Sequence, residues 1–368
     1  MQFKAAVLTQ TNGPLEILDV EIPELHPGDV LVRVMASGLC HTDLEAIQGR
    51  LGLPLPLIPG HEGAGIVERV GSAVTRVKAG DHIVCSWNPY CGHCFYCDEG
   101  QTILCEARTS AEPKGHLLGG GTRLRLNGDE LYHYSFVCSH AQYCVIPESG
   151  AVKIPETMPF DRACLLGCGV LTGVGAVIRK AQVRAGSSVA VLGCGALGLN
   201  VLQGARMAGA ETIIAIDVRD DKLHKAEAFG ATHTLNATEV DIISEVKRLT
   251  SGRGADYVFE AAGIDNTLQA SLDVTRPGGN LVILGKTLAD KEIPLRWGSL
   301  APERVITRSS SGGAKPHHDF PFLARAYLDG KLMLDELIDK HIALEDINQG
   351  FAEMEHGGLV RAVIDMEH

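Results

Sequence analysis

The sequence predicts an α/β protein with two domains, one rich in β-strands and one built on a doubly wound parallel sheet. The chain of 368 residues is long enough for two domains. From residue 186 to about 310, apolar strands alternate with helices, which is typical of a parallel sheet covered on both faces. From Phe3 to about Val84, short strands separated by turns indicate a small barrel-like domain. The expected domains are 1–169 with 311–368, and 170–310.

Composition and charge narrow the class of protein. Hydrophobic residues make up 45% of the chain and charged residues 21%, which is ordinary for a globular protein with a large core. The net charge of −12 argues against nucleic acid and anionic membranes as partners, because both attract basic surfaces. No apolar run reaches the length of a membrane span, and the N-terminus lacks the features of a signal peptide. We therefore expect a cytoplasmic enzyme.

The β-rich domain is expected to contain strands that end close to residues able to bind a metal. Cys40-His41-Thr42-Asp43 and Gly60-His61-Glu62 each follow a turn or the end of a strand. Residues 106–134 are polar and rich in glycine, so we expect a long loop there. The other expected elements are strands at 15–20, 30–37, 63–71 and 143–147, and a helix at 161–180 that Gly167-Cys168-Gly169 interrupts.

Four cysteines form the most specific motif, in the order C-x2-C-x2-C-x7-C: Cys91, Cys94, Cys97 and Cys105. Four thiolates at this spacing fit a closed tetrahedral zinc site, which leaves no position for water and stabilises structure. An iron–sulfur cluster is the alternative by ligand count, but no proline follows the last cysteine and the last spacing is long. The total of eleven cysteines is odd, so metal ligation explains them better than a disulfide framework does.

The stretch from Ser188 to Gly198 predicts a dinucleotide-binding turn, because an apolar strand runs directly into Gly-x-Gly-x-x-Gly and a helix follows. Gly193 permits the bend, Gly195 lets the backbone approach a pyrophosphate, and Gly198 lets the helix pack on the strand. Asp217 ends the next strand, where a carboxylate would bind the ribose and favour NAD over NADP.

The rest of this domain is expected to continue the alternation. The expected strands are 188–192, 212–216, 232–234, 256–260, 280–284 and 305–309, and the expected helices are 196–208, 220–229, 239–249 and 266–275. The chain then returns to the first domain with helices at 319–328 and 343–356 and a strand at 359–364.

Several motifs together carry a resemblance: Gly38–Asp43, Gly60–Gly65, the four cysteines, Gly167–Gly173, the dinucleotide turn and Arg361. In order and spacing they resemble the zinc-dependent medium-chain dehydrogenase/reductases, and within that family the zinc alcohol dehydrogenases of the class III and aryl alcohol type. The resemblance covers nearly the whole chain. It implies a GroES-like catalytic domain, a Rossmann cofactor domain, NAD, and two zinc ions per subunit, one catalytic and one structural.

The resemblance implies how the catalytic zinc is bound. Cys40, His61 and Cys168 would be its three protein ligands, which leaves a fourth position for water or substrate. Glu62 would lie beside this site. Asp43 would accept a hydrogen bond from His61 and fix its tautomer.

The resemblance also implies the reaction, in which an alcohol held as its alkoxide gives hydride to the nicotinamide ring. Thr42 resembles the hydroxyl that takes the alcohol proton and passes it to the cofactor ribose. Glu45 stands where many relatives have a histidine that completes the proton path. Either Glu45 or water finishes this path, or the path ends at the ribose.

Four further residues are expected to contact NAD. His41 and Arg361 resemble residues that contact the pyrophosphate, and Thr172 is expected to bind the cofactor as well. Lys222 resembles a lysine that binds the ribose, with a solvated helix lysine as the alternative.

Trp87, Ser110, Tyr134 and Ser135 fall where the family lines its substrate channel, and Trp87 would favour a flat or slender alcohol over a bulky secondary one. We expect a primary alcohol, aromatic or allylic, as substrate. The alternative is a formaldehyde dehydrogenase that oxidises S-hydroxymethyl conjugates of glutathione or mycothiol. Against it, the stretch Arg50–Pro54 lacks the acidic residue of the glutathione-dependent branch, and Thr109 stands where that branch has arginine.

A zinc-containing NAD-binding protein without turnover is a third hypothesis, which the complete set of metal and proton-path residues argues against. For quaternary structure, the edge strand at 305–309 is expected to pair with its copy across a two-fold axis. We therefore predict a homodimer.

Overall fold

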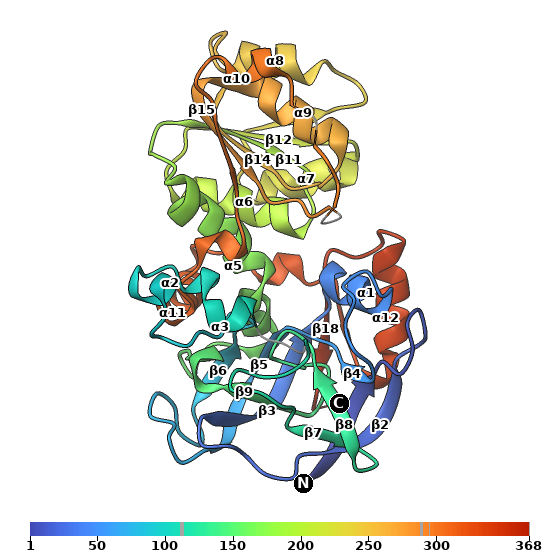
Figure 1. Ribbon diagram of the computed structural model, residues 1–368. Coiled ribbons are helices and arrows are strands. Elements are labelled where there is room, and N and C mark those ends of the chain that lie inside the picture. Colours follow the sequence, from blue (N-terminus) through green and yellow to red (C-terminus); the bar gives the residue numbers. More distant parts are fainter. Residues whose placement is uncertain (111–113, 288–289, 294, 368) are drawn as a thin grey trace. The chain divides into compact units, whose positions relative to one another are not determined.

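The computed structural model describes residues 1–110, 114–287, 290–293 and 295–367 (Figure 1). These residues form two compact units, each with its own core. The first unit is Met1–Cys168 with Lys315–His368, and the second is Gly169–Ala314, compared with the expected range 170–310. The predicted α/β class, with a β-rich domain and a parallel-sheet domain, is confirmed.

The first unit is built on two sheets. The smaller sheet has the strand order β1 (Gln2–Val7), β2 (Glu16–Glu21), β7 (Leu124–Leu126), β8 (Asp129–His133) and β4 (Leu57–Ile58). The larger sheet has the order β10 (Ala151–Lys153), β6 (His82–Cys85), β5 (Glu62–Val70), β3 (Asp29–Gly38), β18 (Ala362–Asp365) and β17 (Lys340–Ile342), and β9 (Tyr143–Pro147) pairs with β3. Side chains from both sheets, including Phe3, Val32, Val67 and Leu124, pack in one hydrophobic core.

Short helices connect these strands. The α-helices of the first unit are α1 (His41–Ile47), α2 (Phe95–Asp98), α3 (Glu106–Thr109), α4 (Phe160–Ala163), α11 (Pro316–Leu328) and α12 (Ile347–Glu355). Its 3-10 turns are Thr102–Leu104, Glu148–Gly150, Cys164–Gly167, Asp335–Leu337 and Leu344–Asp346. The last strand, β18, lies between β3 and β17, so the C-terminal part of the chain completes the larger sheet.

The expectation of a loop across residues 106–134 is wrong, because this stretch contains α3 and the hairpin of β7 and β8. Asn127 and Gly128 both have positive φ, 54° and 90°, as a two-residue hairpin turn requires. Leu124 and Leu131 lie opposite each other on the two strands, and both side chains are fully buried in the core. The polar composition hid a hairpin that the Asn-Gly pair between apolar residues indicates.

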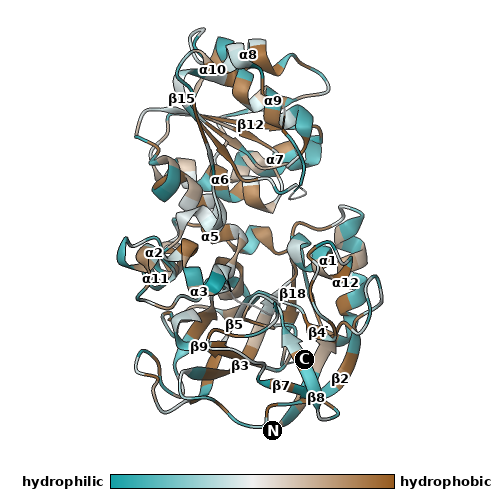
Figure 2. Cartoon of the chain, in the orientation of Figure 1, coloured by the Kyte–Doolittle hydropathy of each residue, from teal (hydrophilic) through white to brown (hydrophobic). Residues whose placement is uncertain are grey.

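The second unit contains one sheet in which every pairing is parallel. Its strand order is β13 (His233–Asn236), β12 (Thr212–Asp217), β11 (Ser188–Leu192), β14 (Ala255–Glu260), β15 (Thr275–Ile283) and β16 (Val305–Arg308). The strand order reverses beside β11, so the sheet is doubly wound as predicted. Figure 2 shows hydrophobic residues concentrated on these strands, which is typical of a sheet covered on both faces.

The helices of the second unit lie between its strands in sequence. They are α5 (Gly169–Gly175), the π-helical turn Ala176–Ala181, α6 (Ala196–Met207), α7 (Asp220–Ala228), α8 (Ile242–Leu249), α9 (Asp265–Val274), α10 (Trp297–Leu300) and the 3-10 turn Ser311–Gly313. Each strand and helix expected here has a counterpart. β15 begins at Thr275, earlier than expected, with an irregular register opposite Ala255 and Tyr257.

In the described part of the chain, no single helix has both the length and the apolar composition needed to cross a membrane. One bent pair of helical segments, Phe160–Gly167 and Gly169–Ala181, meets both criteria together, and most of its residues are buried inside the protein.

Candidate metal and cofactor sites

The topology of the larger sheet brings Cys40 and His61 together. β3 and β5 pair antiparallel, with Gly38 opposite Glu62, so the end of one strand lies beside the start of the other. The chain leaves β3 into α1, whose N-cap residue is Cys40, and it enters β5 through His61. Cys40 and His61, which are far apart in sequence, therefore meet where the end of β3 lies beside the start of β5.

Cys40, His61, Glu62 and Cys168 form a cluster whose ligand atoms all lie within 4.8 Å of one another. Cys40, His61 and Glu62 are buried, and Cys168 is half-buried. The Nε2 atom of His61 and the Oε2 atom of Glu62 are buried without a hydrogen-bond partner. Two sulfurs, an imidazole nitrogen and a carboxylate are ligands that zinc accepts, and an unpaired buried nitrogen is costly unless something binds it. The residues present therefore fit a zinc ion.

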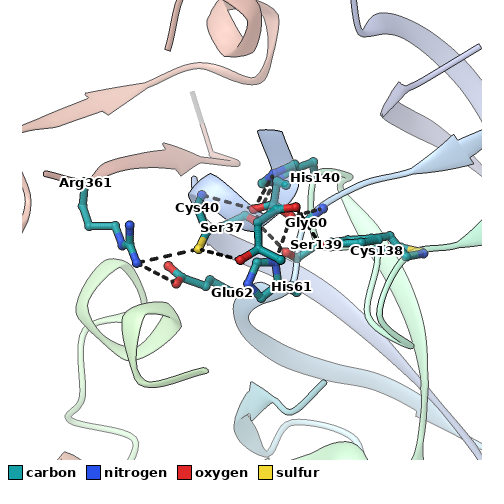
Figure 3. Close-up of polar contacts among 12 residues, drawn as sticks. Ser37, Cys40, Gly60, His61, Glu62, Cys138, Ser139, His140 and Arg361 are labelled. Carbon is teal, nitrogen blue, oxygen red and sulfur yellow. Dashed lines mark hydrogen bonds and ion pairs between the residues drawn. The ribbon is translucent and has the colours of Figure 1, made fainter. Parts of the chain in front are cut away.

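Asp43 fixes the orientation of His61. Its Oδ1 atom accepts hydrogen bonds from His61 Nδ1 at 2.8 Å and from the Gly60 N–H at 3.1 Å, and its Oδ2 atom accepts from the Cys40 N–H at 3.1 Å (Figure 3). Because a carboxylate accepts, the His61 Nδ1 atom carries a proton. Although burial opposes it, Asp43 and Cys40 raise the pKa of His61 well above its ordinary value. Nε2 is the ring nitrogen left to bind a metal, which would displace the proton from it. This is the arrangement expected for a histidine that binds a metal through Nε2.

Arg361 lies within the same cluster. Its Nη2 atom donates to Glu62 Oε1 at 3.3 Å and lies 3.8 Å from the Cys40 Sγ atom. Arg361 was expected to contact the cofactor pyrophosphate, but its guanidinium is buried and pairs with a residue of its own unit. Such a cation balances the negative charge of a thiolate and carboxylate cluster.

The pKa values of the cluster reflect these contacts. Burial raises the pKa of Glu62 to about 7, although the charge of Arg361 opposes the rise. A hydrogen bond with Cys168, together with the charges of Arg361 and His61, holds the pKa of Cys40 well below its usual value, against the effect of burial. The same pairing and burial raise the pKa of Cys168. One sulfur of the pair is therefore favoured as a thiolate even before a metal binds.

Thr42 and Tyr134 lie next to this cluster. The Thr42 Oγ1 atom is 3.9 Å from Cys40 Sγ, and the Tyr134 hydroxyl donates to the Thr42 carbonyl at 3.0 Å. The Tyr134 ring packs edge-on against the His61 ring, with centroids 5.7 Å apart. Glu45 and His41 lie on α1, half-buried and exposed respectively.

The other residues expected in the substrate channel have local contacts. Trp87 packs against the hydrophobic core of the first unit, and its Nε1 atom is buried without a hydrogen-bond partner. Ser110 follows α3, and its hydroxyl donates to the Glu106 carbonyl at 2.5 Å. Ser135 follows Tyr134 with φ of 52°. Their role toward substrate stays a prediction.

The four-cysteine lobe is a second, more local cluster, and the sulfur atoms of Cys91, Cys94, Cys97 and Cys105 all lie within 4.8 Å of one another. Cys91 and Cys94 precede α2, Cys97 lies within it, and Cys105 directly precedes α3. Backbone N–H groups of these segments donate to the sulfur atoms. The Cys91 N–H donates to Cys105 Sγ at 3.3 Å, and a hydrogen bond from the Glu106 backbone lowers the pKa of Cys94 to about 6. The four sulfurs fit a tetrahedral zinc ion.

The dinucleotide turn adopts the expected form in the second unit. Gly193 has φ of 95°, and a Cβ atom on Gly198 would lie 1.8 Å from the Gly193 carbonyl oxygen, so both positions require glycine. Around Gly195, the N-cap of α6, the space is open. The Asp217 Oδ2 atom accepts from the Cys194 N–H at 2.7 Å, which ties the end of β12 to the turn. An anion at the N-terminus of α6 would meet free backbone N–H groups.

Two residues expected to bind the cofactor lie on other helices of this unit, and each is half-buried. Lys222 lies in the first half of α7 and Thr172 in α5.

The sequence analysis missed three buried polar residues behind Asp43: Ser37, Ser139 and His140. Ser37 lies near the end of β3, and the other two precede β9. None belongs to a recognisable motif, so only the fold shows that they meet.

Comparisons with known proteins agree with this architecture. The alcohol dehydrogenase GroES-like domain matches residues 26–156, and the zinc-binding dehydrogenase domain matches residues 196–328. The S-(hydroxymethyl)glutathione dehydrogenase of Paracoccus denitrificans is 39% identical over 374 residues, which cover 99% of this chain and 100% of the relative. The class-3 alcohol dehydrogenase of Drosophila melanogaster is 39% identical over 368 residues, which cover 98% of this chain and 97% of the relative.

Solved structures of alcohol dehydrogenases also match nearly the whole chain. The alcohol dehydrogenase zinc-binding domain protein from Burkholderia ambifaria has a TM-score of 0.96 at 35% identity, with 100% of both chains covered. The benzyl alcohol dehydrogenase from Acinetobacter calcoaceticus has a TM-score of 0.94 at 30% identity, with 100% of this chain and 99% of the other covered.

The fold and the matching domains define an oxidoreductase with a GroES-like domain and a Rossmann-like cofactor domain. More particularly, this chain belongs to the zinc-containing alcohol dehydrogenase family of the medium-chain dehydrogenase/reductases.

Proposed function

We propose that this enzyme uses zinc and NAD to oxidise a primary alcohol to the aldehyde. The observation that carries the proposal is the cluster of Cys40, His61 and Cys168, in which the buried Nε2 atom of His61 has no hydrogen-bond partner. This donor set fits an open zinc site with three protein ligands.

Cys40, His61 and Cys168 would hold the catalytic zinc, and Cys91, Cys94, Cys97 and Cys105 a structural one. Zinc bound in the first cluster supplies a Lewis acid that makes a hydroxyl group easier to ionise. Asp43 holds the His61 ring, and Arg361 balances the charge of Glu62 and Cys40. Glu62 therefore stays beside the metal as a paired carboxylate.

Thr42 is the residue we assign to receive the alcohol proton, because its hydroxyl lies 3.9 Å from the Cys40 sulfur. The Tyr134 hydroxyl donates to the Thr42 backbone carbonyl and so limits the movement of the Thr42 side chain. Glu45, three residues further along α1, is our candidate for the next group on the path to solvent.

NAD is the proposed cofactor, and when bound it accepts the hydride. Gly193, Gly195 and Gly198 would receive its pyrophosphate at the N-terminus of α6, with Asp217 at the adenosine ribose. Lys222, Thr172, His41 and Arg361 remain predicted contacts of the cofactor.

Two substrates are candidates. The relatives that are 39% identical are named S-(hydroxymethyl)glutathione dehydrogenase or class-3 alcohol dehydrogenase, and this favours an S-hydroxymethyl thiol conjugate over the free alcohol that the sequence analysis preferred. The free aromatic alcohol is supported by the likeness to benzyl alcohol dehydrogenase at 30% identity. Arg108, the nearest cation to the position where the glutathione-dependent branch has arginine, donates to the Ile103 carbonyl inside the lobe. A conjugate would therefore need another cation for its charged end.

The test is NADH formation by zinc-loaded enzyme, compared between formaldehyde with glutathione or mycothiol and a panel of primary, aromatic and secondary alcohols. We expect the thiol conjugate to have the highest kcat/KM. Higher kcat/KM for benzyl alcohol without thiol would assign the enzyme to the second candidate, and no NADH with either the thiol conjugates or any of the alcohols would refute the proposal.

A homodimer in the cytoplasm completes the proposal. β16 pairs with β15 at the end of the sheet order, and Val305 and the nearby Trp297 are 52% and 81% exposed, so a second copy would cover an apolar edge. All eleven cysteines are free, which fits a reducing compartment. Light scattering at micromolar concentration should give twice the chain mass of 39.2 kDa, and a monomer would refute the dimer.

A further inference from the structure

Three polar side chains form a buried layer on the side of Asp43 away from the metal cluster. Ser37, Ser139 and His140 are each fully buried. The Ser37 hydroxyl lies 2.9 Å from His140 Nδ1 and 2.7 Å from the Ser139 hydroxyl (Figure 3). Neither the family motifs nor the proposed reaction uses these residues.

Backbone hydrogen bonds hold this layer against the segment that leads through His61 into β5. The Ser139 N–H donates to the Gly60 carbonyl at 3.0 Å, and the His140 N–H donates to the Pro59 carbonyl at 3.2 Å. A Cβ atom on Gly60 would lie 2.5 Å from the His140 nitrogen, and one on Gly63 would lie 2.7 Å from the Ser139 Cβ atom. The two glycines therefore permit the close approach that places His140 behind Asp43.

The other ring nitrogen of His140 faces Asp43. His140 Nε2 is buried without a hydrogen-bond partner and lies 3.9 Å from Asp43 Oδ2. This distance is longer than a hydrogen bond, so the contact is electrostatic. The other acceptor directions of Asp43 are taken by the Cys40 and Gly60 N–H groups and by His61.

The charges decide which nitrogen of His140 carries the proton. Burial lowers the pKa of His140 to about 4, so at neutral pH the ring has a single N–H. With the proton on Nδ1, the Nε2 lone pair would face the Asp43 carboxylate and be repelled. With the proton on Nε2, its positive end faces Asp43, while Nδ1 accepts from Ser37, whose oxygen accepts from Ser139. The serine hydroxyls can donate or accept in either arrangement, so the charge of Asp43 is what favours the second one.

Building on the proposed zinc site, we infer that His140 is a positioning residue for His61. Its Nε2–H stabilises the Oδ2 atom of Asp43 and so keeps the Oδ1 atom aligned on His61 Nδ1. His61 in turn presents Nε2 to the metal. The charge of Asp43 selects this tautomer, and the hydrogen bonds of Ser37 hold the Nδ1 side of the ring. His140 therefore lies at one end of this chain of contacts, and the metal ligand His61 lies at the other.

Three variants separate a positioning role from a packing role. In His140→Gln the side-chain amide reaches the place of Nε2 and keeps a donor toward Asp43. In His140→Asn the amide reaches only the place of Nδ1 and keeps the contact with Ser37. His140→Phe keeps the ring area, including the edge-on contact with Phe351, and removes both nitrogens.

The measurement is the affinity for Co²⁺, by chelator competition, together with the absorption bands of the bound ion. Each variant also has its unfolding midpoint measured without metal. We expect His140→Phe and His140→Asn to weaken Co²⁺ binding at this site about tenfold and to shift its bands, as loss of an outer hydrogen-bonding partner typically does. His140→Gln should stay within about threefold of the wild type. Wild-type affinity and bands in all three variants, or equal weakening in all three, would overturn the inference.

Cys40→Ser distinguishes failure of this inference from failure of the proposed function. The four-cysteine lobe also binds Co²⁺, so the signal of the first cluster is the part that Cys40→Ser removes. If Cys40→Ser leaves the spectrum unchanged, the proposed metal site and this inference both fail. If it removes bands that the His140 variants do not alter, only the positioning role fails. The Gln and Asn variants keep the test decisive if the Phe variant does not fold.

Discussion

The two metal-competent clusters of this chain are assembled in opposite ways. The lobe takes its four sulfurs from one short segment, Cys91 to Cys105, and its helices are single turns. The other cluster takes Cys40, His61 and Cys168 from three separate places, and the pairing of β3 with β5 brings the first two together. We therefore expect the lobe to depend on its metal for order and the Cys40 cluster to depend mainly on the fold.

The second difference lies in the groups around the ligands. The Cys40 cluster includes a buried ion pair, Arg361 with Glu62, and a buried carboxylate, Asp43, on its histidine. The lobe offers four sulfurs and backbone N–H groups. A closed set of four thiolates suits a structural metal, and three ligands with charged neighbours suit a site where substrate charge changes. This contrast predicts that a substitution in one cluster leaves metal binding at the other cluster unchanged.

The largest effect should come from replacing one cysteine of either cluster by serine. Cys40→Ser should lower the rate of NADH formation by roughly 10³-fold, about 4 kcal/mol of lost Lewis-acid stabilisation, with the unfolding midpoint nearly unchanged. The matched variant Cys97→Ser should make the lobe sensitive to protease, because structural zinc supplies folding energy. The rate per folded molecule should be nearly retained. Equal loss of rate in both variants would break the comparison.

The buried ion pair should give the next largest effect. Arg361→Met leaves Glu62 as an unpaired buried carboxylate and should destabilise the protein by about 3 kcal/mol, measured by chemical denaturation. The double variant Arg361→Met with Glu62→Gln should recover part of this loss, because no charge is then left unpaired. A large loss of NAD affinity with unchanged stability would instead support the predicted contact of Arg361 with the pyrophosphate.

The support of His61 by Asp43 should give a smaller effect confined to one cluster. Asp43→Asn should weaken zinc binding at the Cys40 cluster by roughly 10- to 100-fold, because the amide disturbs the His61 tautomer. Zinc in the four-cysteine lobe should keep its wild-type affinity. Metal competition with a chelator resolves the two sites, and a wild-type affinity at both would contradict the role given to Asp43.

The smallest effect concerns acid stability and lies outside both clusters. Burial lowers the pKa of His133 to about 3, helped by the charge of Arg123, so the folded protein holds this ring neutral. The unfolded chain takes up the proton below about pH 6.5, so stability is complete above that pH and is lost as the pH falls from 6.5 toward 3. His133→Gln keeps an acceptor for the Arg123 N–H and should lessen this loss by about 1.4 kcal/mol per pH unit. Denaturation curves at pH 7 and pH 5 check this, and identical pH dependence would contradict it.

The comparison also explains how much the sequence alone could predict. The lobe is local, so the spacing of its four cysteines was enough. The parallel sheet follows from periodicity, and the turn at Gly193 from its glycines and the strand before it. The hairpin at Asn127-Gly128 was readable but was hidden by its polar surroundings.

The Cys40 cluster could be predicted only from the family resemblance, because no spacing rule joins Cys40 to Cys168. The contacts of Arg361 with Glu62 and of His140 with Ser37 could not be predicted, since each joins segments distant in sequence. Such pairs depend on sheet register and on the room that Gly60 and Gly63 leave, which only the three-dimensional structure gives.

The central claim is that the Cys40 cluster and the four-cysteine lobe are separate zinc sites. The most direct measurement is the number of zinc ions per chain, by elemental analysis of wild-type protein, Cys40→Ser and Cys97→Ser after removal of loosely bound metal. We expect about two zinc ions per chain in the wild type and about one in each variant. The same number in Cys40→Ser as in the wild type, with NADH formation retained, would contradict it.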